Sequence, residues 1–230
     1  MNNNKYFYTI NGEKVIFDNY KEYTKGNCGY LYKKDNTILK IYTTSCKYNY
    51  YVTKKMFNLL KELNIPNIVT LYDYYYYNNA PLFNHIIPPD AYTMKYIRDD
   101  NIDITKVSRD YLLETVNALE KTCIELSKNK ILIGDAHHGN IIFNSNGVTL
   151  VDIDSYFTNN ILTFKRIQLH NKKKILYFFR SKIEHDYPTG KENMICYKIN
   201  NIISNLYKND SSLTYEFSKI LTKNNLTDSI

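Results

Sequence analysis

The alternation of apolar and polar residues predicts short strands in the first part of the chain. Segments rich in β-branched and aromatic residues are separated by turn residues such as Asn11-Gly12, a pattern typical of strands joined in hairpins. The segments interpreted as strands are 6–10, 14–17, 37–42, 71–76 and 91–97, and in the segment 25–32 glycines stand ahead of a further strand. We therefore expect the first hundred residues to be mainly strands and turns.

Two segments carry apolar residues at helical spacing. The first runs over residues 54–63 and stops before Pro66, and the second is a longer stripe over residues 112–126. The apolar positions are Met56, Leu59, Leu60 and Leu63 in the first, and Leu112, Val116, Leu119, Cys123 and Leu126 in the second. We expect a short helix over the first segment and a long buried helix over the second.

The strongest functional signal lies in residues 133–154. Apolar runs on either side of the turn 144–147 predict a β-hairpin. Asn140 enters the first strand and Asp152 leaves the second, so antiparallel pairing brings them together, and Asp135 lies on the loop that leads to Asn140. Two carboxylates and an amide oxygen suit a hard cation that carries phosphates. The alternative is that these three are only turn and strand-end residues.

This arrangement resembles the protein-kinase-like superfamily. Asp135 and Asn140 match the Asp-x-x-x-x-Asn of its catalytic loop, and Asp152 matches the metal-binding Asp of its Asp-Phe-Gly motif. The resemblance implies that Asp135 orients the acceptor hydroxyl and receives its proton, while Asn140 and Asp152 bind Mg²⁺. It also implies an α+β, bilobal fold. Residues 1–97 would form an antiparallel-sheet N-lobe with one helix, ending in a hinge, and residues 98–230 a mostly helical C-lobe.

The resemblance also implies an ATP site. Lys40 matches the strand lysine that contacts the α- and β-phosphates, and a buried ammonium needs an anionic partner of that kind. Gly26 and Gly29 match two positions of the glycine-rich hairpin that covers the phosphates, although ordinary turn glycines would look the same. Met94 would lie at the back of the adenine pocket, and Tyr96 would be among the residues that offer backbone groups to the base.

The chain departs from the family at the first predicted helix. The acid that should pair with the strand lysine would fall near Met56, where the neighbours include Lys55 and Phe57 and no acid. Three explanations stay open: another acid holds Lys40, the lobe is regulated differently, or activity is weak.

The resemblance fades after Asp154. Basic residues over 165–182 alternate with apolar ones, which predicts an amphipathic helix with a solvated basic face. A groove for an acidic substrate is the alternative.

The catalytic-loop pattern Gly-Asp-x-His-x-x-Asn, residues 134–140, is similar to that of aminoglycoside and choline kinases and of compact bacterial protein kinases. In this interpretation His137 stabilises the transferring phosphoryl group or the loop, although a structural role is equally open. About 130 residues follow the hinge, which leaves little material for a metabolite pocket. We therefore favour a compact Ser/Thr protein kinase acting on a protein substrate, with a small-molecule kinase and an ATP-binding pseudokinase as alternatives.

The composition of the chain indicates which kinds of partner and which cellular compartment to expect. The 230 residues carry a net charge of +7, below the level typical of nucleic-acid-binding proteins. No apolar run is long enough to span a membrane, and four scattered cysteines fit free thiols in a reducing cytosol. We expect a cytoplasmic protein, in its own or a host's cytosol, that binds neither nucleic acid nor membrane.

Overall fold

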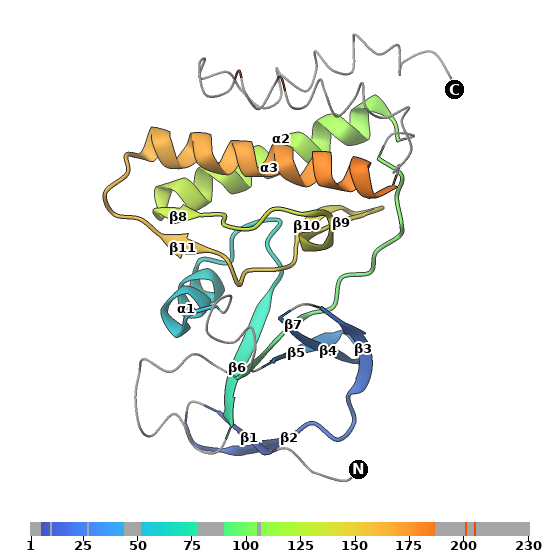
Figure 1. Ribbon diagram of the computed structural model, residues 1–230, viewed down its shortest axis with the longest axis vertical. Helices are drawn as coiled ribbons and strands as arrows, with labels where there is room; N and C mark the ends of the chain where they lie inside the picture. The colour runs from blue at the N-terminus through green and yellow to red at the C-terminus, as the bar shows by residue number, and fades with distance from the viewer. Residues whose placement is uncertain are drawn as a thin grey trace. The chain divides into compact units, whose positions relative to one another are not determined.

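The computed structural model describes residues 6–9, 11–26, 28–43, 52–77, 90–104 and 107–186, together with residues 201 and 205. The chain divides into two compact units (Figure 1). The first is drawn from Met1–Asn64, Val69–Ile97 and Ile153–Ser155, and the second from Ile65–Ile68, Arg98–Asp152 and Tyr156–Ile230.

The first unit is built on an antiparallel sheet of seven strands in the order β2-β1-β6-β7-β5-β4-β3. The strands are β1 (Tyr6–Tyr8), β2 (Lys14–Ile16), β3 (Lys21–Lys25), β4 (Gly29–Lys34), β5 (Thr37–Tyr42), β6 (Leu71–Tyr77) and β7 (Ala91–Lys95). The central strands β5, β6 and β7 lie where the hydrophobic pattern predicts them.

The segment 25–32 contains the turn that leads into β4, in agreement with the prediction of glycines ahead of a strand. The chain turns within this segment: β3 ends at Lys25, β4 begins at Gly29, and the Gly26 amide donates to the Gly29 carbonyl at 2.9 Å. Gly29 packs tightly on the neighbouring strand, since a Cβ at this position would lie 2.5 Å from the Ile41 carbonyl oxygen. The two glycines therefore flank the tight β3–β4 turn, and one of them has a structural reason to be glycine.

The two faces of this sheet differ in chemistry because side chains alternate along each strand. Leu39 belongs to an apolar cluster on one face. Lys40 and Tyr42 lie on the opposite face, where Tyr92 is directly across from Lys40 on β7. The apolar cluster consists of Phe7, Leu39, Tyr75 and Ala91.

Helix α1 (Lys54–Leu63) covers the lysine-bearing face. Thr53 caps its first turn by accepting a backbone amide through Oγ1 at 3.1 Å, and Asn64 ends it in the left-handed conformation with φ 43°. The fully buried ring of Phe57 lies with its centroid 5.8 Å from that of Tyr92. The helix predicted over residues 54–63 is confirmed.

In the residues that the structure describes, the second unit combines two long helices with short strands. Its elements are α2 (Arg109–Lys128), β8 (Ile131–Leu132), the 3₁₀ turn η2 (His138–Asn140), β9 (Ile141–Asn144), β10 (Gly147–Leu150), β11 (Phe157–Thr158) and α3 (Phe164–Asp186). Helices α2 and α3 pack together (Figure 1). The expectation of a mostly helical second half is met only in part, because strands and loops occupy the chain between these helices.

The apolar stripe predicted for the long helix forms the buried face of α2. Leu112, Val116, Leu119, Cys123 and Leu126 are all buried. Burial also raises the pKa of the Cys123 thiol, which keeps it protonated and unreactive. Within the described part of the chain, no helix is both long and apolar enough to cross a membrane.

Strands β9 and β10 form the predicted hairpin. Ile141 lies opposite Leu150, and Gly147 takes a φ of 116° at the turn, a conformation that favours glycine. The Leu150 amide also donates to the Asn67 carbonyl at 2.8 Å, which fixes the second strand. The hairpin is therefore a rigid support for the residues at its open end.

Candidate functional site

Lys40 forms a buried ion pair in the first unit. Its Nζ lies 2.6 Å from Oδ2 of Asp154, and the two side chains are 9% and 6% exposed. A charge this deeply buried needs an opposite charge nearby. Asp154, two residues after Asp152, supplies that charge.

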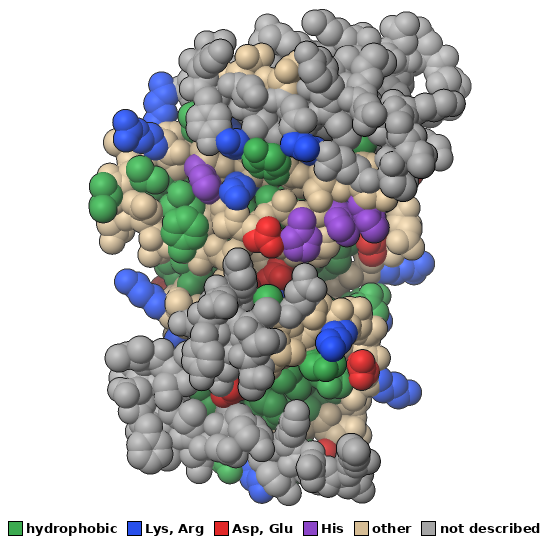
Figure 2. Space-filling model, in the orientation of Figure 1, with side chains coloured by type: hydrophobic (Ala, Val, Ile, Leu, Met, Phe, Trp, Pro, Cys, Tyr) green, Lys and Arg blue, Asp and Glu red, His purple; other side chains and the backbone are tan. Residues whose placement is uncertain are grey.

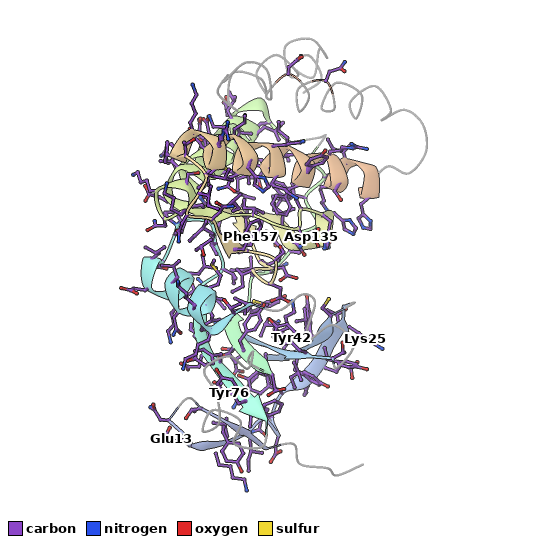
Figure 3. All side chains as sticks on the ribbon, turned by 60° about the vertical axis from the view of Figure 1, so that its left-hand side comes forward. Glu13, Lys25, Tyr42, Tyr76, Asp135 and Phe157 are labelled. Carbon is purple, nitrogen blue, oxygen red and sulfur yellow. The ribbon has the colours of Figure 1, made fainter. Side chains whose placement is uncertain are left out.

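Two tyrosines hydrogen-bond to the other oxygen of the Asp154 carboxylate. The hydroxyl groups of Tyr42 and Tyr92 donate to Oδ1 at 2.6 Å and 3.2 Å. The Tyr42 hydroxyl also accepts the amide of Val52, just before α1, at 3.2 Å. Figure 3 labels Tyr42 at the end of β5. Both carboxylate oxygens therefore have partners, and the pair is fixed to two neighbouring strands.

Helix α1 contributes apolar side chains where the family resemblance calls for an acid. Met56 and Phe57 are buried, and the first turn of the helix contains no acidic residue. The acid of this helix, Glu62, is exposed in its last turn. Of the three explanations left open by the sequence, the structure supports the first: another acid holds Lys40, and that acid is Asp154.

In the second unit, Asp135 is accompanied by His137. His137 Nε2 lies 3.4 Å from Oδ2 of Asp135, and both side chains are about half exposed. His137 Nδ1 accepts the Gly139 amide at 3.0 Å. With Nδ1 on the Gly139 amide, the other ring nitrogen, Nε2, lies on the side of the Asp135 carboxylate. The loop thereby orients the carboxylate.

Gly139 makes room for this imidazole. A Cβ at position 139 would lie 3.0 Å from Cε1 and 3.2 Å from Nδ1 of His137. Histidine side chains gather beside acidic ones on this face of the second unit (Figure 2). A Cβ at position 139 would require the His137 ring to shift by a few tenths of an ångström.

Asn140 and Asp152 lie at the open end of the β9–β10 hairpin. Beyond the last pair of the ladder, the Val151 amide donates to the Asn140 carbonyl at 3.0 Å, and Asp152 follows directly. Asn140 is buried and Asp152 partly so. Within the described ranges, no group of three or more His, Cys, Asp or Glu is placed to bind a metal. An amide and one carboxylate instead fit a magnesium ion whose remaining ligands are phosphates and water.

Helix α3 holds the strand that leads into the Asp135 loop. The fully buried Asn171 accepts the Ile133 amide through Oδ1 at 2.9 Å and donates to the Ile131 carbonyl at 2.9 Å. His170 donates from Nε2 to the Ile133 carbonyl at 2.8 Å. Lys174 donates to the carbonyl of Gly134, the residue before Asp135. Burial lowers the pKa of His170, although the hydrogen bond to the Ile133 carbonyl acts in the opposite direction.

These contacts correct the interpretation of the basic stretch. The predicted helix over residues 165–182 is present, but its basic face is not simply solvated. Lys172 is buried and lies 3.5 Å from the Glu120 carboxylate on α2, and Lys174 contacts the loop before Asp135. Part of the basic stretch therefore supports the site.

Near its C-terminus, α3 also contacts η2. The His138 amide donates to the Ser181 hydroxyl at 2.9 Å, and the ring of His138 stacks on that of His185 with centroids 3.9 Å apart. Helix α3 therefore contacts the chain both just before Asp135 and at His138.

The remaining predicted site residues lie in the first unit. Gly26 and Gly29 flank the β3–β4 turn, and Met94 is buried in β7 opposite Ile38. The Tyr96 amide donates to the Asn36 carbonyl at 2.8 Å. Any backbone contact from Tyr96 to a base would therefore use its carbonyl group.

The structure groups the predicted site residues in two sets. Lys40, Gly26, Gly29, Met94 and Tyr96 belong to the first unit, and Asp135, His137, Asn140 and Asp152 to the second.

Sequence reasoning missed Asp154 and the two tyrosines that hold it. The second carboxylate of Asp152-Ile153-Asp154 was a visible signal, because acids are seldom buried without a cation as partner. Tyr42 and Tyr92 gave no signal among the 24 tyrosines of the chain.

No protein family and no curated protein matches the sequence. Among solved structures, the chain is similar to the kinase domain of PknI from Mycobacterium tuberculosis, with 13% identity, a TM-score of 0.47, and coverage of 73% of this chain and 76% of that one. It is also similar to the Legionella pneumophila kinase Lpg2603, solved bound to IP6, with 18% identity, a TM-score of 0.48, and coverage of 94% and 85%. Both similarities are to kinase structures, and both are at low sequence identity.

Proposed function

We propose that this protein is an ATP-dependent phosphotransferase that uses Mg²⁺. One observation carries the proposal: Asn140 and Asp152 lie at the open end of one hairpin, and the loop entering that hairpin presents Asp135 with His137 3.4 Å away. Phosphoryl transfer to a hydroxyl requires groups that bind a metal ion and a carboxylate that orients the acceptor, and these residue types fit those two roles.

In this proposal Asp135 orients the acceptor hydroxyl and takes its proton, while His137 holds the carboxylate in place. Asn140 and Asp152 hold the magnesium ion, which when bound neutralises charge on the phosphates. These two ligands fit that ion because Mg²⁺ in phosphate sites commonly takes one or two protein carboxylates or amides and completes its shell with phosphate and water.

The groups of the first unit would hold the nucleotide. Lys40 would contact the α- and β-phosphates from its place on β5, and the β3–β4 turn with Gly26 and Gly29 would cover them. Met94 and the Tyr96 carbonyl would contact the base. The buried surroundings of Lys40 support this role, because a desolvated ammonium interacts strongly with an anion.

For the acceptor we propose a Ser/Thr hydroxyl on a protein. Over the described residues between 98 and 186, two long helices and short strands leave little material for an enclosed metabolite pocket. A small-molecule kinase of the aminoglycoside or choline type is the second candidate, supported by the pattern over residues 134–140.

The test is transfer of labelled phosphate from ATP, with and without magnesium. The acceptors would be the protein itself, casein, and a panel of aminoglycosides and amino-alcohols. Label on protein supports the first candidate, and label on a small molecule supports the second. If ATP raises the melting temperature equally with magnesium and with EDTA, and no phosphate moves, the protein is an ATP-binding pseudokinase.

Asp152→Asn sharpens this test. Replacing one anionic ligand by a neutral one should raise the magnesium concentration needed for half-maximal transfer and nearly abolish turnover. Glu114→Gln, an acid-to-amide change on the exposed face of α2, is the matched control and should leave both unchanged.

A further inference from the structure

We propose that Asp154 is the residue that positions Lys40 for the nucleotide phosphates, in place of an acid on α1. This inference rests on the proposed function and specifies how its lysine is held. It identifies the segment Ile153–Ser155, rather than helix α1, as the part of the chain on which the lysine depends.

The first support is the geometry of the pair. Nζ of Lys40 and Oδ2 of Asp154 are 2.6 Å apart, and both side chains are buried. Because Lys40 is on a central strand with neighbours on both sides, its backbone is fixed by β4 and β7. The direction of its flexible side chain is then set by the carboxylate.

The second support is the way the carboxylate itself is held. The hydroxyls of Tyr42 and Tyr92 both donate to Oδ1, which leaves Oδ2 directed at Lys40. Tyr42 is on the same strand as Lys40, and Tyr92 is directly across from it. Three donors converge on one acid, an arrangement that a carboxylate can satisfy and a carboxamide cannot.

The third support comes from α1. Its buried positions are Met56, Phe57 and Leu60, and Phe57 packs on the rings of Tyr74 and Tyr92. The helix therefore supports a tyrosine that holds Asp154 instead of contributing an acid of its own. At this position α1 provides the aromatic packing of Phe57 rather than a charged side chain.

A consequence for regulation follows. When the acid lies on a helix, movement of that helix alone can break the pair. Here the acid follows the proposed metal ligand Asp152 by two residues, so the lysine and the metal ligand are coupled through one short segment. A change in that segment would release Lys40 directly, whereas a change on α1 would reach the pair only through the packing of Phe57 on Tyr92.

The test measures the reactivity of individual lysines by trace labelling with acetic anhydride and peptide mass spectrometry. Only the neutral amine reacts, and removing an adjacent carboxylate favours that form. In Asp154→Asn, labelling of Lys40 at fixed pH should rise at least about tenfold. The matched control is the exposed pair of Lys61 and Asp73, 3.2 Å apart with side chains 45% and 63% exposed. Asp73→Asn should change labelling of Lys61 by less than about twofold.

Repeating the labelling with MgATP separates this inference from the proposed function. In the wild type MgATP should protect Lys40, and Asp154→Asn should need more MgATP for half-protection. Unchanged labelling and protection in Asp154→Asn would overturn the inference. A different outcome is possible, in which Asp154→Asn raises the labelling of Lys40 but MgATP does not protect Lys40 in the wild type. That outcome would confirm the ion pair. It would contradict both the proposed function and the positioning role of Asp154.

Asp154→Glu covers the case in which the amide variant does not fold. It retains the charge but lengthens the side chain by one methylene. Labelling of Lys40 should stay close to the wild-type value, while half-protection should need more MgATP because the ammonium is displaced. Protection identical to the wild type in this variant would overturn the positioning role.

Discussion

Replacing either member of the Lys40–Asp154 pair should destabilise the protein, and replacing both should cost much less than the sum. The perturbation is a double-mutant cycle of Lys40→Met, Asp154→Asn and the double variant. Each single change leaves one buried group without its opposite charge, whereas the double variant removes both charges. In the double variant the Asn carbonyl still accepts hydrogen bonds from the two tyrosines.

The magnitude follows from the geometry. At 2.6 Å, two unit charges attract by about 6 kcal/mol at an effective dielectric constant of about 20. Desolvation of the two ions offsets most of this attraction, so the net contribution of the intact pair is small. Removing one partner keeps the desolvation cost and loses the attraction, which is expected to cost about 3–5 kcal/mol. Because the double variant should cost no more than either single change, we expect a coupling energy at least equal to one single cost, about 3–5 kcal/mol.

The assay is urea unfolding followed by far-ultraviolet circular dichroism for the four proteins of the cycle. The exposed pair of Lys61 and Asp73 provides a parallel cycle, with an expected coupling of less than about 1 kcal/mol. A coupling below about 0.5 kcal/mol for Lys40 and Asp154 would refute the conclusion that they form a buried ion pair.

Three further predictions concern the loop that carries Asp135. Gly139→Ala should displace the His137 ring and lower the transfer rate about 10- to 100-fold with little change in ATP affinity, as measured by single-turnover kinetics and calorimetry. Asn171→Leu should cost about 3 kcal/mol in urea unfolding, because the Ile133 amide and the Ile131 carbonyl lose their buried partner; a loss below about 1 kcal/mol would contradict this. Burial lowers the pKa of His170 from 6.5, so its contribution to stability is complete above that pH and lost as the pH falls through the lowered pKa. The melting temperature of His170→Gln should therefore fall less between about pH 7 and pH 5 than that of the wild type. An equal fall in the two proteins would contradict this prediction.

The sequence predicted best the elements whose signals are local. The hairpin β9–β10 follows from an Asn-Gly turn between apolar runs, and α1 and the buried stripe of α2 follow from helical spacing. Strand β3 (Lys21–Lys25) was not predicted, because all five of its residues are exposed and the segment has no apolar face to indicate a strand.

The partner of Lys40 was beyond sequence reasoning for a different reason. Asp154 is 114 positions away from Lys40, and only the fold brings the two charges together. The contacts of α3 also join residues that are far apart in the sequence. Asn171 and Lys174 look like residues of a solvated helix, yet they hydrogen-bond to the strand and loop before Asp135.

The most direct test of the phosphotransferase proposal is the single-turnover rate of phosphoryl transfer in Asp135→Asn, measured beside its affinity for MgATP. The variant retains the volume and one acceptor oxygen but loses the base and the charge. We predict that transfer falls about 10²- to 10⁴-fold while the affinity for MgATP and the melting temperature stay near the wild-type values, with Glu114→Gln unchanged in all three. An unchanged transfer rate would place the chemistry elsewhere, and loss of MgATP binding with unfolding would make Asp135 a structural residue of the loop.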